Sequence, residues 1–289
     1  MIIMRLMGGL GNQMFQYALG RRLALDRNVP LKLYLNWYEK VDDRQYELDQ
    51  LNINAEIASY EEFFRLTYYS RNWFTRKLYK IYQYPISYYR KRYVIEQEPR
   101  KFDSNIFRVP KTAYLIGYWA CERYFEPIQA RIRQEFSPSI PLSESHQKLS
   151  LKIQNDPSSV SVHIRRGDYV FQPGFLVLPM DYYHRAVAYI NQNIQSPHFY
   201  VFSDDIDWVK VHLKLNGEMT FIEPSAGGND LLDMQLMSQC RHYINANSSF
   251  SWWGAWLGEK SDSIVIVPNQ WHANKPYPKD LIPNRWVRL

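Results

Sequence analysis

The side chains with the greatest chemical potential in this chain lie in the segment 161–171. They are one imidazole, two guanidinium groups and one carboxylate: His163, Arg165, Arg166 and Asp168. Val162 and Ile164 alternate with polar residues, which is typical of a strand with one buried face, and Gly167 allows a sharp turn after it. Charged groups gathered at one strand end are costly to hold unless an anion binds there. The segment therefore predicts an anion-binding site.

Two adjacent arginines cannot both point along one face of a strand. We therefore expect Arg165 to lie at the ligand together with His163, and Arg166 to brace Asp168 or a helix end. Arginine suits phosphate, because each charge-assisted hydrogen bond contributes about 1.5–3 kcal/mol. A purely structural network of buried ion pairs is the alternative for these residues.

A glycine-rich turn over residues 8–13 lies between a predicted strand (2–6) and a predicted helix (about 14–27). Free backbone N–H groups at a helix start bind phosphate. The candidate residues for binding a phosphorylated ligand at this turn are Gly9, Gly11, Asn12 and Gln13. Met14 replaces the third glycine of the dinucleotide fingerprint, and the second strand (31–35) ends without an acid that would bind a ribose. Nicotinamide and flavin cofactors are therefore disfavoured, and a plain strand–helix turn is the alternative.

Acidic residues follow the apolar strand 198–202. Asp204 lies at the carboxyl end of that strand, where α/β proteins bind their ligands, so we expect it to accept hydrogen bonds from the ligand. Asp205 and Asp207 are candidates for holding a metal on a diphosphate, but their positions suit the start of a helix, where acids complement the dipole. No metal site is therefore expected, and a metal held on a diphosphate by Asp205 and Asp207 is the alternative.

Hydroxyl groups gather at a second turn, between a predicted strand (243–246) and a predicted helix (250–257). With the helix N-terminus they form another candidate anion site, although capping alone would explain one serine. The candidate donor-binding residues are Ser248, Ser249, Phe250 and Ser251. The tryptophans that follow are expected in the core: Trp252, Trp253 and Trp256. Together, the two turns, the arginines and Asp204 describe a site for a nucleotide diphosphate, where the chemistry is displacement at the attached sugar carbon.

Length and element order predict the fold. A chain of 289 residues can bury one large core or two moderate ones. Strand-like and helix-like segments alternate, which predicts an α/β fold with parallel sheets. The proline-containing segment 137–141 follows a predicted helix (123–136) and breaks the chain into two lobes. We expect domains at 1–140 and 155–289.

The net charge of +6 is unevenly distributed. The region 60–95 is basic and aromatic, which suits a solvated helix pair, a peripheral contact with an anionic membrane or lipid-linked acceptor, or a nucleic-acid surface. The last lacks an accompanying motif and is disfavoured. There is no signal peptide and no apolar run long enough to span a membrane. Cys121 and Cys240 have neither a disulfide nor a zinc spacing. We expect a cytoplasmic protein, in peripheral contact with the inner face of the membrane if 60–95 binds lipid.

Four segments, taken in order along the chain, resemble the motifs of the α1,2-fucosyltransferases of glycosyltransferase family 11. They are residues 8–18, 163–169, 202–205 and 247–257. The resemblance implies a GT-B fold, with two Rossmann-like domains facing across a cleft and the donor held mainly by the second. It implies transfer of L-fucose from GDP-β-L-fucose to the 2-hydroxyl of a terminal galactose, with inversion and without a metal or other cofactor. The chain resembles bacterial members, which indicates surface polysaccharide or O-antigen synthesis.

The resemblance also implies roles for individual residues. It places Arg165 on the β-phosphate, and Ser248, Ser249 and Ser251 near the phosphates. Inversion by a single in-line displacement needs a base that takes the proton of the acceptor hydroxyl, for which Asp168 is the preferred candidate and His163 its rival. A free oligosaccharide and a lipid-linked glycan are both open as acceptors. Two alternative functions remain: a non-catalytic protein that binds a sugar nucleotide or a glycan, and a metal-dependent glycosyltransferase of other specificity that uses Asp205 and Asp207.

Overall fold

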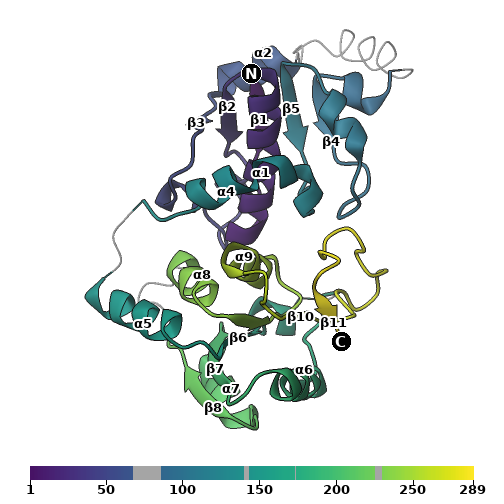
Figure 1. Cartoon of the computed structure of the whole chain (residues 1–289). Coiled ribbons are helices and arrows are strands. Elements are labelled where there is room, and N and C mark those ends of the chain that lie inside the picture. The colour runs from purple at the N-terminus through teal and green to yellow at the C-terminus, as the bar shows by residue number, and fades with distance from the viewer. Residues whose placement is uncertain (68–85, 140–142, 173, 225–229) are drawn as a thin grey trace. The chain divides into compact units, whose positions relative to one another are not determined.

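The computed structural model describes residues 1–67, 86–139, 143–172, 174–224 and 230–289. The chain forms two compact units, each with its own sheet (Figure 1). Unit 1 comprises Met1–Ser139 and Lys279–Leu281, and unit 2 comprises Ile140–Pro278 and Ile282–Leu289. The predicted α/β fold of two Rossmann-like units, GT-B-like in this respect, is confirmed. Each unit is described by itself below.

The sheet of unit 1 has the strand order β3-β2-β1-β5-β4, and all neighbouring strands run parallel. The strands are β1 (Ile2–Arg5), β2 (Leu31–Tyr34), β3 (Glu56–Ile57), β4 (Tyr93–Ile95) and β5 (Ala113–Ile116). The α-helices are α1 (Leu10–Arg27), α2 (Tyr60–Thr67) and α4 (Gln129–Glu135). From β1 the chain moves to one side through β2 and β3, whereas β5 and β4 lie on the other side. The strand order therefore reverses between β1 and β5, and this is where α/β sheets bind ligands.

The start of α1 differs from the prediction. The helix begins at Leu10, four residues before the expected Met14, so Gly11, Asn12 and Gln13 lie inside its first turn. The cause is the backbone just before it: Gly8 has a φ of +80° and Gly9 is the extended N-cap residue. Glycine adopts such a positive φ without steric cost, so the sharp turn is completed before the helix starts.

The predicted single helix over 123–136 is wrong. The chain forms two short 3₁₀ turns there, and only α4 is an α-helix. Pro127 lies in the second turn and has no backbone N–H, so an α-helix cannot run through it without losing a hydrogen bond. Other 3₁₀ turns cover Tyr38–Lys40, Leu48–Gln50, Tyr88–Arg90, Ser104–Arg108 and Asp168–Val170.

The sheet of unit 2 has the order β11-β10-β9-β6-β7-β8 and is also parallel. The strands are β6 (Ser159–Ile164), β7 (His198–Ser203), β8 (Glu218–Phe221), β9 (His242–Ile244), β10 (Val265–Val267) and β11 (Val287–Arg288). The helices are α5 (Glu144–Gln154), α6 (Met180–Asn193), α7 (Ile206–His212), α8 (Asp230–Ser238) and α9 (Ser249–Gly258). The strand order reverses between β6 and β9, which makes this pair the ligand-binding switch point of the sheet.

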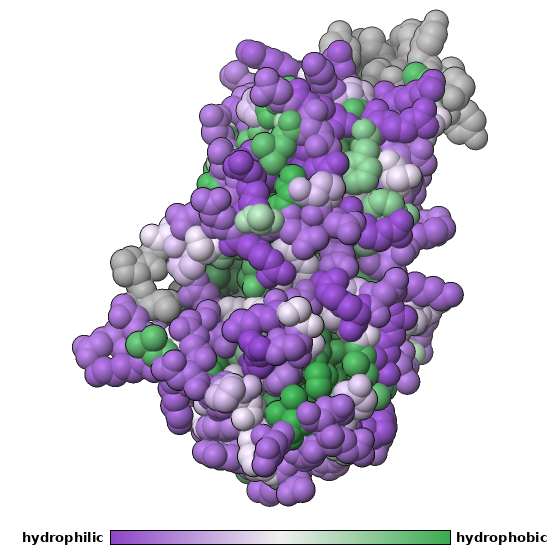
Figure 2. Space-filling model, viewed as in Figure 1, coloured by the Kyte–Doolittle hydropathy of each residue, from purple (hydrophilic) through white to green (hydrophobic). Residues whose placement is uncertain are grey.

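The hydrophobic core of unit 2 fixes the direction of the β6 side chains. Val160, Val162 and Ile164 pack with Tyr182 and Ala186 of α6. Ser161 and His163 therefore point to the other face of the sheet. The three tryptophans of α9 are fully buried, as predicted. Figure 2 shows that the surface on the face drawn is mostly hydrophilic, with hydrophobic residues in smaller patches.

The basic aromatic region lies only partly within the described residues. Residues 68–85 fall outside them. Of the flanking parts, 60–67 form α2 and 93–95 form β4, and the ring of Phe63 stacks on Tyr34 at 4.6 Å between centroids. In the described part of the chain, no helix is long and apolar enough to cross a membrane. Cys121 and Cys240 are buried free thiols.

Candidate functional site

The candidate site of unit 2 is formed by three loops at one edge of its sheet. These loops follow β6, β7 and β9, which are adjacent in the sheet, so their carboxyl ends lie together. They carry three of the four segments singled out in the sequence: 163–169, 202–205 and 247–257. Since the strand order reverses between β6 and β9, side chains from these loops meet at the position where parallel sheets bind phosphorylated ligands.

Arg165 is the central cation of this site. Its Nη2 lies 2.6 Å from Oδ1 of Asp168, and its Nε lies 3.1 Å from Oδ2 of Asp204. The guanidinium carbon also lies 5.5 Å from the centroid of the Tyr169 ring. Burial alone would lower the pKa of Arg165, but the carboxylates of Asp204 and Asp168 outweigh it and raise the pKa above its ordinary value. Arg165 is therefore a permanent positive charge, held between two acids at the strand end.

Arg166 points elsewhere, as the alternation along a strand requires. Its Nε lies 3.0 Å from Oδ2 of Asp205, and its guanidinium carbon lies 3.4 Å from the centroid of the Trp208 ring. Asp205 is the N-cap residue of α7. Of the two predicted roles for Arg166, bracing a helix end is the one seen, whereas Asp168 is held by Arg165. The side chain of Arg166 is thus occupied by α7, away from Arg165.

Asp204 organises the turn between the two arginines. Its Oδ1 accepts the backbone N–H of Arg166 at 2.8 Å, and its Oδ2 accepts from Arg165. The carboxylate also lies so close to Gly167 that a Cβ atom there would be 2.4 Å from Oδ2. Glycine is required at this position for the close approach. Asp204 therefore sets both the backbone and the guanidinium of the loop after β6.

His163 is buried beneath the site. It is 3% exposed. Burial is the main cause that lowers its pKa to about 3, and the positive charge of Arg165 adds to the effect. Its ring centroid lies 5.5 Å from that of Phe250 on α9. The imidazole is therefore neutral near pH 7, and only a weak base. This weighs against His163 as the residue that takes a proton from an acceptor.

Asn245 lies beside His163 and was not among the site residues predicted from the sequence. Val162 of β6 is paired with Ile244 of β9, so the next residue of each strand points to the same face. Asn245 is 1% exposed, and neither its amide oxygen nor its amide nitrogen has a hydrogen-bond partner, nor does Nδ1 of His163. Unpaired buried polar groups are rare and costly. The only signal in the sequence was a polar residue at the end of a strand, which is visible once the pairing of β6 with β9 is known.

The turn before α9 separates its four candidate residues into two kinds. Ser248 is the N-cap residue, and its hydroxyl accepts the backbone N–H of Phe250 at 3.2 Å. Ser249 and Phe250 are half-buried. Ser251 is fully buried and donates its hydroxyl to the backbone carbonyls of Ala246 and Ser248. Ser251 therefore stabilises the turn itself. Ser249 and Phe250 are the two half-buried residues among the four candidates.

Tyr169 connects the two loops on either side of the switch point. Its hydroxyl donates to the backbone carbonyl of Asn247 at 3.2 Å. Asn247 is buried, and its amide donates to the carbonyls of Leu176 and Trp271, both at 2.9 Å. The position of Arg165 thus depends on a chain of contacts that reaches the start of α9. Neither tyrosine nor asparagine had been assigned this role from the sequence.

The remaining predicted residues belong to unit 1. Gly9, Gly11 and Asn12 lie at the start of α1, and Asn12 and Gly9 are half-buried. Gln13 is fully buried: its amide nitrogen donates to the carbonyls of Gly8 and Gln45, and its amide oxygen accepts the backbone N–H of Glu47. Gln13 therefore fastens the glycine turn to the loop at 45–47. The N-terminus of α1 carries the positive end of the helix dipole, which suits an anion.

Within the described residues, no group of three or more histidine, cysteine, aspartate or glutamate side chains is arranged to hold a metal ion. Asp205 is held by Arg166, and the side chain of Asp207 is 95% exposed. The chemistry that the site offers is that of a fixed cation next to carboxylates. Such a cation can stabilise negative charge on a leaving phosphate, and a neighbouring carboxylate can accept a proton.

The chain is similar to known glycosyltransferases. A family model described as glycosyl transferase family 11 matches residues 64–288. The α-1,2-colitosyltransferase of Escherichia coli is 36% identical over 299 residues, which cover 100% of this chain and 98% of that protein. The O-antigen biosynthesis glycosyltransferase WbnK of Escherichia coli is 31% identical and covers 98% and 99%. Galactoside α-(1,2)-fucosyltransferase 2 of Bos taurus is 29% identical and covers 61% and 54%.

Proposed function

The chain belongs to glycosyltransferase family 11, and on that basis we propose that it is an α1,2-fucosyltransferase that uses GDP-β-L-fucose as its donor. The acceptor is the 2-hydroxyl of a terminal galactose, on an oligosaccharide or a lipid-linked glycan. The similarity to a protein of O-antigen biosynthesis supports a role in the synthesis of a bacterial surface polysaccharide. The similarity to a galactoside α-(1,2)-fucosyltransferase supports the linkage.

The observation that carries this proposal is the Arg165–Asp168 pair at the carboxyl edge of β6. When GDP leaves the sugar, negative charge builds on its β-phosphate, and a fixed guanidinium stabilises that charge. Arg165 is already held in place by Asp204, so it need not be reoriented during the reaction. Backbone N–H groups at the start of α9, in the same unit as Arg165, would supply a further positive end for the phosphates.

The proposed base is Asp168. The reaction is a single in-line displacement: the acceptor oxygen forms a bond to C1 of fucose, the bond to the GDP oxygen breaks, and the acceptor proton passes to the carboxylate. The configuration at C1 is inverted. In the structure Asp168 is engaged by Arg165, so a phosphate that binds Arg165 competes with Asp168 and would release its carboxylate to the acceptor. His163 is disfavoured as the base because it is buried and its pKa is about 3.

We propose that no metal or other cofactor takes part, because Arg165 and the N-terminus of α9 would supply the positive charge that a metal supplies elsewhere. We further propose that the protein acts in the cytoplasm, in peripheral contact with the membrane through region 60–95 where a lipid-linked acceptor is used, and that it does not bind nucleic acid.

The donor sugar is the point at which a second candidate must be considered. The relative that matches the whole chain at 36% identity is named for colitose and not for fucose. Colitose transfer at the same site, with the same roles for Arg165 and Asp168, is therefore the alternative.

The test is transfer to a small panel of β-galactosides in excess EDTA, with GDP-fucose and GDP-colitose offered separately. We expect a fucosylated product whose linkage, determined by NMR, is α1→2, and unchanged turnover in EDTA. Colitosylation without fucosylation would support the second candidate. No product from either donor, together with no release of GDP, would exclude both.

A further inference from the structure

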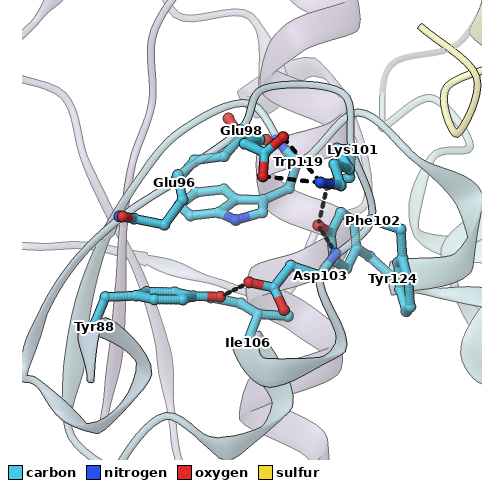
Figure 3. A pocket seen from close by; sticks show the side chains of 10 residues that line it. Tyr88, Glu96, Glu98, Lys101, Phe102, Asp103, Ile106, Trp119 and Tyr124 are labelled. Atoms are coloured by element: carbon cyan, nitrogen blue, oxygen red, sulfur yellow. Dashed lines mark hydrogen bonds and ion pairs between the residues drawn. The ribbon is translucent and has the colours of Figure 1, made fainter.

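Unit 1 contains a cavity of about 190 Å³ that lies outside the candidate donor site. It lies beyond the carboxyl ends of β4 and β5, where Glu96 follows the first strand and Trp119 comes shortly after the second. Glu96, Glu98, Lys101, Asp103, Trp119 and Tyr88 are among the residues that line it (Figure 3). The cavity is thus at the carboxyl edge of the sheet, the edge at which parallel sheets bind ligands, and one strand away from the switch point between β1 and β5.

One wall of the cavity is formed around the carboxylate of Glu96. Its oxygens accept the backbone N–H groups of Tyr118 at 2.7 Å and Trp119 at 3.0 Å. The backbone at Gly117 passes so close that a Cβ atom there would lie 2.4 Å from Cβ of Glu96. Burial raises the pKa of Glu96 although these N–H groups oppose the shift. The carboxylate therefore holds the loop after β5 in one shape.

That shape is strained at Trp119. Its φ is +44°, which is rare for a bulky residue and costs on the order of 1–3 kcal/mol. Strain of this kind is kept where the surrounding contacts enforce it, and it gathers at functional sites. Here it places the indole of Trp119 at the cavity, as Figure 3 shows.

The opposite wall is a second hydrogen-bonded group. Asp103 accepts the hydroxyl of Tyr88 and caps the 3₁₀ turn Ser104–Arg108 through the N–H of Asn105 at 2.9 Å. The hydroxyl of Tyr124 accepts from the N–H of Asp103 at 2.9 Å. At the rim, Glu98 pairs with Lys101 at 2.9 Å, and both are well exposed. The cavity thus has rigid walls and an accessible polar rim.

The lining selects one class of ligand. Three carboxylates against one lysine disfavour a phosphate or any other anion. The volume is below the range of about 300–1,000 Å³ that is usual for drug-sized ligands, so a nucleotide does not fit. Aromatic rings pack against the apolar faces of a sugar, and carboxylate and amide groups bind its hydroxyls. We propose that this cavity binds one neutral pyranose ring of the acceptor glycan, a proposal that rests on the glycosyltransferase function above.

The test uses two variants of the cavity in the full-length enzyme. Glu98→Ala removes an exposed carboxylate at the rim. Trp119→Phe keeps an aromatic side chain but replaces the indole by a smaller ring. Glu144→Ala is the matched control, because Glu144 is also an exposed acid paired with a lysine, Lys148, at 2.7 Å, in unit 2. We expect both cavity variants to raise the KM for a β-galactoside about tenfold, or about 1.4 kcal/mol, with GDP affinity and donor KM unchanged. The control should match wild type.

A second readout is independent of turnover. Saturation-transfer NMR with methyl β-galactoside should show binding to wild type and Glu144→Ala, and weaker binding to Glu98→Ala. If folded Glu98→Ala and Trp119→Phe both keep the wild-type acceptor KM, the cavity does not bind acceptor, although the proposed function stands. If no acceptor is used and GDP-fucose is not consumed by any form, the proposed function fails and this inference fails with it.

Discussion

Arg165 and Asp168 form the shortest contact of the proposed donor site, with 2.6 Å between Nη2 and Oδ1. The two residues lie on either side of Gly167, and the turn that brings them together is held by Asp204. One guanidinium thus faces two carboxylates and, on the proposed function, a diphosphate. The competition for Arg165 links the binding of the donor to the release of the base.

Substitution of the two arginines should separate their roles. Arg165→Lys removes the planar fork that suits a phosphate, so we expect GDP to bind about 10–100-fold more weakly, corresponding to the loss of one charge-assisted hydrogen bond. Arg166→Lys is the control, because that side chain lies on Asp205 and Trp208, and its GDP affinity should change less than about threefold. Calorimetric titration with GDP measures both. Equal losses would mean that Arg166 also contacts the donor.

Gly167→Ala should disturb the site without removing a charged group. The new Cβ would lie 2.4 Å from Oδ2 of Asp204, so the carboxylate must move and Arg165 loses a partner. A misplacement of about 1 Å can lower a rate about 100-fold. We expect a fall in kcat of that order at saturating donor, with a melting temperature within a few degrees of wild type. An unchanged kcat would show that Asp204 does not position the arginine.

His163 predicts how the stability of the protein depends on pH. Its folded pKa is about 3, below the ordinary 6.5, so the unfolded chain binds a proton that the folded chain does not. Above pH 6.5 the protonation of His163 does not lower the free energy of unfolding. As pH falls from 6.5 toward 3, the free energy of unfolding decreases by about 1.4 kcal/mol per pH unit because of this residue. From pH 7 to pH 5 the free energy of unfolding should therefore fall by about 2 kcal/mol less in His163→Asn than in wild type.

Urea unfolding of both proteins at pH 7 and pH 5 measures this difference. His184→Asn, at an exposed position, is the control. Equal pH dependence in wild type and His163→Asn would contradict a buried neutral imidazole.

The stability of unit 1 should depend on one buried ion pair. Arg21 and Glu135 lie 2.8 Å apart, with side chains 10% and 8% exposed, and Tyr17 donates to the same carboxylate at 2.6 Å. Arg21→Met leaves that buried charge with only the exposed and more distant Arg131, at 3.8 Å, and should cost about 3–5 kcal/mol. Arg22→Met on the same helix breaks a more exposed pair with Asp26 and should cost about 1 kcal/mol or less. Chemical denaturation compares the two; similar losses would contradict the burial of the first pair.

Local sequence patterns predicted the parts of the site that depend on neighbours in the chain. Alternation along β6 separated Arg165 from Arg166, and the acids after β7 were correctly placed at the strand end and the start of α7. Contacts between segments could not be predicted in this way. The pairing of β6 with β9 puts Asn245 beside His163, and it requires residues far apart in the chain to be in register.

Side-chain hydrogen bonds were the other feature that local sequence patterns did not predict. Ser251 looked like a donor-binding hydroxyl, but its hydroxyl is used by two carbonyls of its own turn. Gln13 is similarly used by the loop at 45–47. A serine or glutamine in a turn can bind a ligand or the backbone, and only the backbone path through space decides between them.

The most direct test of the central claim is the Asp168→Asn variant, measured for GDP affinity and for transfer. If Arg165 is shared between Asp168 and the donor, removal of the competing charge should leave GDP binding as tight as in wild type or tighter. The same variant has lost its base, so kcat should fall about 10²–10⁴-fold. Asp207→Asn, at an exposed acid in the first turn of α7, is the control and should match wild type in both. Transfer at the wild-type rate, or GDP binding that weakens along with transfer, would contradict the account.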